Sequence, residues 1–540
     1  MPEFIASRIH PPSAGTGPEA TEALAKIVGD LARAYAARRD MSLALEFLRD
    51  KFGGSRFWLY GAGTHSEALL ACFGDAWREH LAGIIDRAPA GRTHFHGIPV
   101  HGIEHAGQGS DEPILVAHLF YEAEMAAALC AAGIDRSRIR HLYLDPDFIE
   151  LSRQTLPRMD GNPDAVILGS TRYISVADSE LARVLDPATT PYLAFDLFDQ
   201  TEPRPPFTVQ SMGKSVDAVV AALRSLNPGL VYLRTTMETN FLAYLVRQVL
   251  PDCVLVHELW DFAVVFEDDT LVRWLKFPPA FIEASRLAEC WSVRESDLVL
   301  SKWGGPQWAE LFDDGIGTEL FFGGISGGPA PVNPPPAEGP PRLLYAGLLP
   351  KPEDLAAMPY DYNFLGRLER LSQAGAATVT ILNSGHGRPE ADWIYRDYQT
   401  RFSQPGIRYS RRVTYDALMG IAAEQDFGWL ALDQRDHWDT GKRCIAPMRF
   451  TGYIQAGLPV IISQPWSFCI QLVERFSAGI VLQGDGDAEA SQALNAADPA
   501  RLRQGVQALQ AYMKAGNDRV LDRLAGLLLK ARNRGKNGGL

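Results

Sequence analysis

The chain has 540 residues, with 52 basic and 65 acidic side chains and a formal net charge of −13. This length exceeds what one hydrophobic core supports, so we expect about three domains. The acidic balance argues against a general nucleic-acid-binding protein, which would carry a basic face. The six cysteines lack paired spacing, which argues against a disulfide framework or a zinc site.

The sequence carries no pattern typical of a membrane-spanning segment. The N-terminus lacks a secretory signal, and no apolar run of about 18 residues occurs, so we expect a cytoplasmic protein of bacterial type without a transmembrane segment. Near the C-terminus an apolar helical stretch precedes Lys530, Arg532, Arg534 and Lys536. Such a basic tail either makes peripheral contact with anionic lipid or a partner, or is a solvated helix end.

The first part of the chain predicts helices followed by a small α/β domain. Residues 1–50 are rich in Ala and Leu at helical spacing and are assigned to N-terminal helices. Residues 51–155 alternate short apolar strands with helical stretches, which predicts a parallel, Rossmann-like sheet. Its first strand, 57–60, leads into a Gly-Ala-Gly turn, and its second, 82–86, ends on an acid.

These turns make the small domain a candidate accessory nucleotide site. Gly61 and Gly63 would let backbone approach a phosphate, and Asp86 lies where a ribose-binding acid would be, although Ser66 occupies the place of a third glycine. The domain resembles the Rossmann modules found beside sugar-nucleotide enzymes. It is either a structural or recognition module or, if it holds a nicotinamide cofactor, the centre of a nicotinamide-dependent enzyme.

Two further α/β series follow. A linker with Pro157, Gly161 and Pro163 leads to a domain at 164–330, and a Pro- and Gly-dense break over 323–341 leads to a domain at 342–485. Residues 486–540 are expected to form C-terminal helices and the tail. The expected strands are 165–169, 192–195, 230–233, 253–257 and 298–300, then 342–346, 377–382, 427–432, 460–463 and 479–482.

The segment from Pro447 to Ser463 predicts a short helix, an abrupt stop and a buried strand. Pro447 suits a helix start, Gly457 a left-handed helix end, and 460–462 a strand covered on both faces. Arg449 lies in the first helical turn, and a guanidinium at a helix N-terminus is a natural seat for a phosphate.

This segment resembles the donor-binding signature of GT-B glycosyltransferases. The matching positions are Pro447, Arg449, Ala456, Gly457, Pro459 and Val460. Gly452 departs from the family pattern, in which a Glu at this place holds the ribose of the donor. Leu348 also departs, because the family has an Arg there that grips the diphosphate.

The resemblance implies a fold and a reaction. The fold would be α/β with three Rossmann-like parallel-sheet domains, the last two forming a GT-B pair around a cleft. The activity would be that of a hexosyltransferase-like glycosyltransferase in glycan or glycoconjugate synthesis. It would move a sugar from a nucleotide-sugar donor to a hydroxyl of a glycan, lipid-linked or protein acceptor, with no metal and no cofactor. The departures keep open a non-catalytic carbohydrate- or nucleotide-binding protein on the same scaffold.

In open α/β sheets, ligands gather at the carboxyl ends of the strands, and this rule selects the candidate donor-binding residues. The rule selects the glycine after the first strand, the turn after the second, and the charged loop that leads into the Arg449 helix. The family resemblance adds the segment around Tyr415, which is similar to the one that meets the nucleotide base in family members. The candidates are Gly347, Gly385, His386, Tyr415, Asp433, Lys442, Arg443, Arg449 and Thr451.

The catalytic candidates end a strand of the preceding domain. His257, Glu258 and Asp261 lie together, and a histidine can exchange a proton near neutral pH while a carboxylate orients it. The family resemblance has this strand end facing the sugar or acceptor. The alternative is a hydrogen-bonded histidine that closes a strand.

Two other motifs are set aside. Gly213-Lys214-Ser215 resembles part of a phosphate loop, but the first glycine is missing and no strand is expected closely before it. His94, His96, His101 and His105 have short spacings but lie in a turn-rich region, so we expect no metal site there.

Overall fold

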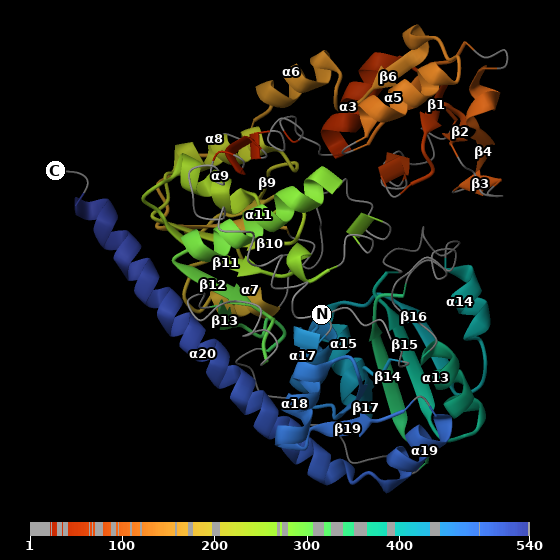
Figure 1. Ribbon diagram of the computed structural model, residues 1–540, viewed down its shortest axis with the longest axis vertical. Helices are drawn as coiled ribbons and strands as arrows, with labels where there is room; N and C mark the ends of the chain where they lie inside the picture. The colour runs from red at the N-terminus through yellow and green to blue at the C-terminus, as the bar shows by residue number, and fades with distance from the viewer. Residues whose placement is uncertain are drawn as a thin grey trace.

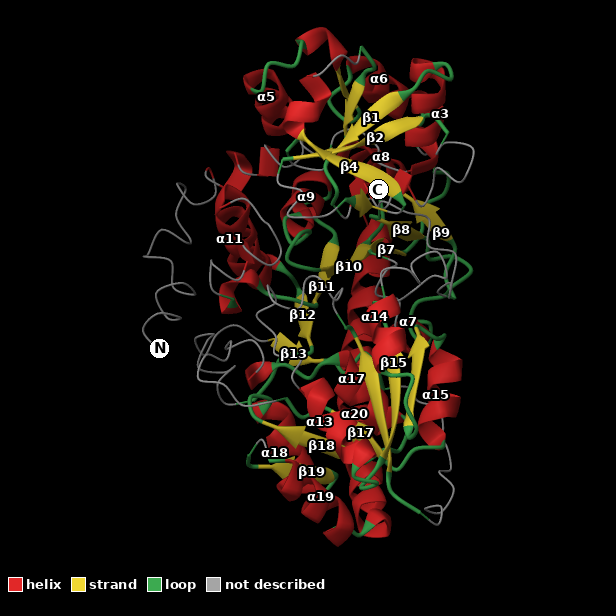
Figure 2. Cartoon of the chain, turned by 90° about the vertical axis from the view of Figure 1, so that its right-hand side faces the viewer, coloured by secondary structure: helices red, strands yellow, loops and turns green. Residues whose placement is uncertain are grey.

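The structure is a computed structural model with three α/β units (Figure 1). It describes residues 22, 24–26, 28–29, 35, 41–63, 65–66, 69–70, 79–87, 93–95, 97–107, 111–118, 121–156, 159–170, 176–196, 206–266, 271–272, 279–305, 318–325, 339–349, 364–385, 395–432, 443–484 and 486–537. Figure 2 shows the sheets of the three units following one another along the long axis of the molecule.

The first unit has a sheet with the strand order β3-β4-β2-β1-β5-β6. Neighbouring strands pair in parallel except β3 and β4, which pair antiparallel. Its elements are α3 Met41–Phe52, β1 Phe57–Tyr60, β2 Leu81–Asp86, β3 His94–Phe95, β4 Ile98–Gly102, η2 Ile103–Gly107, β5 Ile114–Val116, α5 Glu122–Ala131, η3 Arg136–Arg138, β6 Ile139–His141 and α6 Pro146–Gln154.

The segment before the first unit packs in two places. Phe47 and Phe52 of α3 lie in the core of the first unit, whereas Leu24, Val28 and Tyr35 lie in a core of the second. The N-terminal part of the chain therefore bridges the first two units.

The second unit has the strand order β13-β12-β11-β10-β7-β8-β9, and all of its neighbouring strands are parallel. The inner strands are buried on both faces, as expected when helices cover both sides of a parallel sheet. Its elements are β7 Ala165–Gly169, α7 Val176–Leu181, β8 Tyr192–Ala194, β9 Val209–Ser211, α8 Val216–Leu226, β10 Leu230–Thr235, α9 Leu242–Val249, β11 Val254–Leu259, η5 Ala263–Val265, α11 Pro279–Glu295, β12 Leu298–Ser301 and β13 Thr318–Leu320.

The third unit has the strand order β16-β15-β14-β17-β18-β19, again with parallel pairing throughout. Its elements are β14 Arg342–Gly347, α13 Phe364–Gln373, β15 Thr378–Asn383, α14 Arg396–Arg401, β16 Ile407–Arg411, α15 Tyr415–Ala423, β17 Phe427–Trp429, α17 Met448–Gln455, β18 Val460–Ser463, α18 Ser467–Phe476, β19 Gly479–Leu482 and α19 Asp487–Ala496.

The long C-terminal helix α20, Pro499–Asn537, joins the last two units, as Figure 1 shows in dark blue. Its first half packs Val506, Leu509 and Met513 into the core of the third unit. Its second half packs Val520 and Leu524, among others, against one face of the second sheet. Two parallel α/β units with a C-terminal helix that returns across the first of them constitute the GT-B arrangement, so the fold prediction is confirmed.

The turn before α8 differs from the sequence prediction. β9 ends at Ser211 and α8 begins at Val216, so Gly213 and Lys214 do lie in a strand-turn-helix connection. The Lys214 ammonium, however, lies 2.9 Å from Glu238 and 5.7 Å over the Tyr35 ring. Tyr35 of the N-terminal part of the chain thus packs against this turn.

Within the described residues, no helix is long and apolar enough to cross a membrane, and no group of three metal-ligating side chains comes together. His101 and His105 stack on each other with ring centroids 4.1 Å apart.

We expect Asn517 to be the residue of α20 that fixes the connection between the last two units. Its side chain accepts a hydrogen bond from the Phe322 N–H at 2.9 Å and donates to the carbonyls of Phe322 and Ile325. Replacing it with Leu removes the partner of the Phe322 N–H and of the Ile325 carbonyl, while the Phe322 carbonyl keeps its hydrogen bond from the Ile325 N–H, so the free energy of unfolding should fall by on the order of 2 kcal/mol. Urea unfolding followed by circular dichroism measures the change. Asp522→Ala, at an exposed position of the same helix, is the control and should leave stability within about 0.5 kcal/mol of wild type.

Candidate functional site

A pocket of about 380 Å³ opens at the carboxyl ends of β14 and β15 in the third unit. The turns after both strands form one side, and α15 and the first turns of α17 form the other. The described residues that line it are Gly324, Ala346, Gly347, Leu348, Ser384, Tyr415, Leu418, Met419, Ala422, Pro447, Met448, Arg449, Gly452 and Tyr453. Three of the predicted donor-binding residues, namely Gly347, Tyr415 and Arg449, therefore meet in one pocket.

Arg449 supplies positive charge to this pocket. Pro447 is the N-cap of α17 and fixes where the helix begins, so Arg449 falls in its first turn. The guanidinium carbon lies 4.6 Å from the centre of the Tyr345 ring, a favourable cation–π distance. Burial raises the pKa of Tyr345, and the nearby guanidinium opposes that rise. The helix dipole and the side chain thus place positive potential at the same point.

Gly347 is a glycine because Arg449 lies over it. A Cβ at this position would stand 3.1 Å from the guanidinium carbon and 3.1 Å from the Tyr345 hydroxyl. The glycine after β14, predicted from the family pattern as a donor contact, therefore also makes room for the cation.

Tyr415 ties the pocket to the segment between the last two units. It is the first residue of α15, whose N-cap Thr414 accepts a hydrogen bond from the Ala417 N–H. Its hydroxyl donates to the carbonyl of Gly324 at 3.4 Å. Burial raises the pKa of Tyr415, so the hydroxyl stays protonated at neutral pH.

The other donor-site candidates divide into two groups. Gly385 follows the lining residue Ser384 but does not itself line the pocket. Its N–H donates a hydrogen bond to the Asn383 side chain, and a Cβ at Gly385 would stand 2.8 Å from the carbonyl oxygen of Leu349. Thr451 is buried on another face of α17, where its hydroxyl donates to the Met448 carbonyl, so a donor contact through Thr451 is not supported by its position. Arg443 is exposed outside the lining. His386, Asp433 and Lys442 lie outside the described residues.

The structure places His257 in the interior of the second unit, which does not support the predicted proton exchange near neutral pH. Its side chain is fully buried in β11, and its Nε2 lies 2.7 Å from the Thr235 hydroxyl. Burial lowers the pKa of His257 to about 3, so the ring is neutral over the physiological range. The alternative weighed from the sequence, a hydrogen-bonded histidine closing a strand, describes its position.

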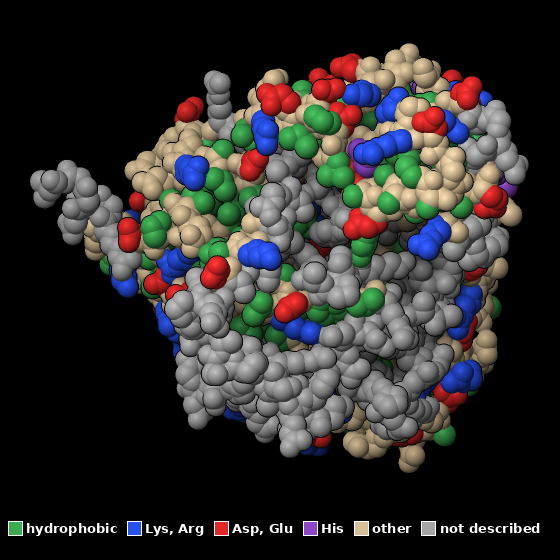
Figure 3. All heavy atoms as spheres, turned by 45° about the horizontal axis from the view of Figure 1, so that its top comes forward, with side chains coloured by type: hydrophobic (Ala, Val, Ile, Leu, Met, Phe, Trp, Pro, Cys, Tyr) green, Lys and Arg blue, Asp and Glu red, His purple; other side chains and the backbone are tan. Residues whose placement is uncertain are grey.

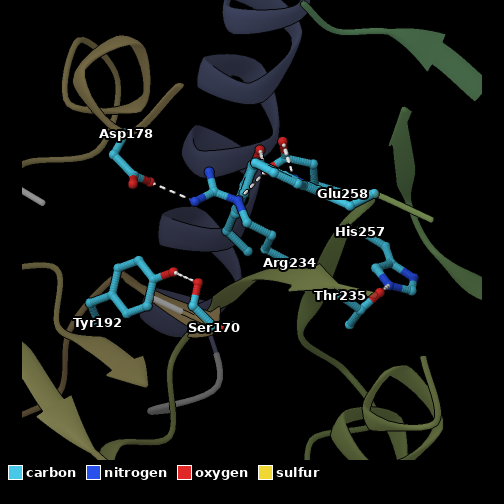
Figure 4. Close-up of polar contacts among 9 residues, drawn as sticks. Ser170, Asp178, Tyr192, Arg234, Thr235, His257 and Glu258 are labelled. Carbon is cyan, nitrogen blue, oxygen red and sulfur yellow. Dashed lines mark hydrogen bonds and ion pairs between the residues drawn. The ribbon is translucent and has the colours of Figure 1, made fainter. Parts of the chain in front are cut away.

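Glu258 is also an interior residue. It points to the opposite side of β11 from His257, as neighbouring strand residues do, and Figure 4 shows it beside Arg234. Its carboxylate accepts hydrogen bonds from the Tyr232 hydroxyl, the Arg234 Nε and the Trp260 indole, at 2.7 to 2.9 Å. Arg234 in turn donates to Asp178 at 2.9 Å. The carboxylate is therefore committed to hydrogen bonds within the core.

Asp261 keeps part of its side chain in solvent. Its carboxylate lies 3.4 Å from the Lys302 ammonium, and that ammonium lies 5.1 Å over the Trp260 ring. Among the three catalytic candidates, Asp261 is thus the one that both carries charge and reaches the surface, with an exposed side-chain fraction of 30%.

A short backbone contact brings Lys302 close to the start of α17. The Lys302 carbonyl accepts from the Ala446 N–H at 2.9 Å, and the Gly304 N–H donates to the Cys444 carbonyl at 2.8 Å. Trp303 and Ile445 form an antiparallel bridge between these hydrogen bonds. The end of β12 in the second unit is therefore joined directly to the segment that enters the Arg449 helix. No local sequence pattern marks a contact between residues so far apart, so the sequence does not indicate this one.

In the first unit, the carboxylate of Asp86 holds the glycine turn that follows β1. Gly61 has a φ of 100°, and the N–H of Ala62 donates to an Asp86 carboxylate oxygen at 2.8 Å. Gly63 is exposed, with open space where a Cβ would stand. The turn thus has the predicted shape, and one oxygen of Asp86 is committed to it.

Charges of both signs are interspersed over the described surface that Figure 3 shows. Among the described lining residues of the pocket, Arg449 is the charged one.

Comparison with known proteins gives structural likeness only. No protein-family model matches the chain, and no curated protein matches its sequence. Anabaena HepE, solved in complex with UDP and glucose, is similar over 68% of this chain and 100% of its own, at 12% identity and a TM-score of 0.46. A glycosyltransferase from Rickettsia africae is similar over 68% of this chain and 99% of its own, at 9% identity and a TM-score of 0.44. The lipopolysaccharide outer core galactosyltransferase WaaB is similar over 71% of this chain and 100% of its own, at 14% identity and a TM-score of 0.39. Likeness at this level assigns neither donor nor acceptor to this chain.

Proposed function

We propose that this protein is a glycosyltransferase that moves a sugar from a nucleoside-diphosphate donor to an acceptor hydroxyl. The observation that carries the proposal is the position of Arg449, which lies in the first turn of α17, above Gly347 and inside a pocket at the carboxyl edge of the third sheet. A diphosphate is the ligand that a guanidinium and a helix N-terminus bind best together.

The proposed chemistry divides between the two units. Arg449 and the dipole of α17 would stabilise the negative charge that grows on the leaving diphosphate, a task that a metal ion performs in other enzymes. Asp261 would face the acceptor and receive its proton, with Lys302 holding the carboxylate in place. The acceptor itself would be a glycan, a lipid-linked molecule or a protein.

A release assay tests this proposal. The full chain is incubated with uridine, guanosine and thymidine diphosphate sugars, with and without a mixture of oligosaccharide acceptors, and free nucleoside diphosphate is measured with a coupled enzyme. We expect release from at least one donor that increases with acceptor. Asp261→Asn should slow release while leaving the Kd for the free nucleoside diphosphate unchanged.

A non-catalytic binding protein on the same scaffold gives a different result. It would be stabilised by a nucleotide sugar in thermal unfolding but would release no nucleotide with any donor. That outcome would contradict the catalytic proposal and would leave the donor pocket as a binding site.

A further inference from the structure

The inference concerns the loop that carries Asp261, and it rests on the proposed function. This loop, residues 260–266, follows β11 and contains η5. All of its residues are buried except Asp261, which keeps partial exposure. The ion-pair partner of Asp261, Lys302, follows a different strand, β12. The place of the Asp261 carboxylate therefore depends on how the loop is held against the rest of the second unit.

The first part of the loop is fixed through Trp260. The Trp260 N–H donates a hydrogen bond to the Thr235 carbonyl at 3.0 Å, and the Trp260 carbonyl accepts one from the Trp303 indole at 3.0 Å. The ring of Phe262 lies edge-on to that of Trp303, with centroids 5.7 Å apart. The residues on both sides of Asp261 thus contact Trp303.

The second part of the loop is fixed by Glu289, a residue of α11 that is 1% exposed. Its carboxylate accepts hydrogen bonds from the N–H groups of Ala263 at 2.6 Å and Val264 at 3.1 Å, at the start of η5. The side-chain amide of Asn240, in the segment after β10, donates to the same carboxylate at 2.8 Å. One buried carboxylate therefore joins α11, η5 and the segment after β10.

The contacts of Glu289 suit an ionised carboxylate. All three are N–H donors, and an ionised carboxylate only accepts, whereas the amide of a Gln would turn an N–H of its own toward one of them. Burial raises the pKa of Glu289 to about 7, and the hydrogen bonds from Ala263, Val264 and Asn240 oppose that rise. We propose that Glu289 is a positioning residue of the sugar transfer, which sets the place of the Asp261 carboxylate by holding η5.

A double-variant cycle tests whether Glu289 acts through Asp261. Two quantities are measured on the full chain, namely the rate of nucleoside diphosphate release in the presence of sugar acceptor and the Kd of UDP by calorimetry. Glu289→Gln should slow release about 10- to 100-fold, as a displacement of about 1 Å can do, and should leave the Kd unchanged. The double variant Asp261→Asn, Glu289→Gln should be no slower than Asp261→Asn alone, because Glu289 then has no base to position.

Asp297 offers a matched control. Its carboxylate accepts from the Leu255 N–H at 2.9 Å and from Arg247 at 2.7 Å, near the amino end of β11. Asp297→Asn therefore makes the same chemical change at the opposite edge of the sheet and should keep the release rate within about twofold of wild type, since distant sites act independently.

A second variant reaches the same carboxylate from the other side. Asn240→Ala removes one donor to Glu289 and leaves its charge in place. It should slow release by a smaller factor than Glu289→Gln, and it too should add nothing to Asp261→Asn. The melting temperature shows which variants are folded, and the cycle with Asn240→Ala decides the question if Glu289→Gln is not.

The outcomes separate this inference from the proposal beneath it. Release by Glu289→Gln or by Asp261→Asn at the wild-type rate overturns the inference and leaves the sugar transfer in place. A double variant that is slower than Asp261→Asn by the full factor of Glu289→Gln also overturns it, because Glu289 would then act independently of Asp261. No release by the wild type with any donor overturns the proposed function and the inference together.

Discussion

Replacing Arg449 with Ala is expected to weaken binding of UDP by roughly 10- to 100-fold, because a hydrogen bond to a charged group in a partly desolvated site contributes about 1.5–3 kcal/mol. The guanidinium is the charged group among the described lining residues of the pocket, and it lies against Tyr345 and Gly347 rather than in open solvent. Calorimetry of the wild type and the variant with the same nucleotide measures the change.

Two further variants test whether binding depends on where the Arg449 charge lies, and not only on the presence of a cation. Arg443→Ala removes an exposed cation outside the pocket lining and should change the Kd by less than about twofold. Gly347→Val keeps Arg449 but fills the space beneath it, so the guanidinium must move and binding should weaken almost as much as in Arg449→Ala. Equal affinities in wild type and Arg449→Ala would contradict the account of the pocket.

Replacing Arg234 with Met is expected to lower the free energy of unfolding by roughly 3–5 kcal/mol, the usual cost of removing one partner from a buried ion pair. Arg234 is 2% exposed and lies between the carboxylates of Asp178 and Glu258, as Figure 4 shows. Without it, the two buried carboxylates that it pairs lose the cation that lies between them. Urea unfolding monitored by tryptophan fluorescence measures the loss.

Two controls identify charge as the cause. Tyr232→Phe removes one hydrogen bond that Glu258 accepts from an uncharged donor but keeps the Arg234 cation, so it should cost less, about 1.5–3 kcal/mol. The triple variant Arg234→Met, Asp178→Asn, Glu258→Gln removes the uncompensated charges, so it should be more stable than Arg234→Met alone. A triple variant as unstable as the single one, or less stable, would show that packing rather than charge dominates at this position.

The sequence predicted the third unit well because local rules determine its key segment. Pro447 and Gly457 mark the start and the end of α17 by their backbone preferences, and an apolar run that both faces of a parallel sheet can bury follows as β18. Helical spacing then places Arg449 in the first turn. These are short-range effects, so the sequence alone contains them.

The catalytic candidates show where such reasoning ends. In a strand covered on both faces, a polar residue near the carboxyl end can face the core or the cleft, and sequence does not distinguish the two. His257 and Glu258 both face the interior, on opposite sides of β11. The contact between Trp303 and Ile445 depends on how two units pack, which no local pattern encodes.

In the first unit, the sequence predicted the shape of the glycine turn but not the hydrogen bond that holds it. The turn at Gly61 was predicted from its glycines, and its positive φ agrees with that. The hydrogen bond from Ala62 to Asp86, which commits the presumed ribose-binding acid to the turn itself, depends on the register of two strands and could not be read from their sequences.

A crystal structure of the full chain soaked with UDP is the most direct measurement. We predict density for the diphosphate within hydrogen-bonding distance of the Arg449 guanidinium. Density for the nucleotide at the Gly61 turn of the first unit, with nothing bound beside Arg449, would contradict the account.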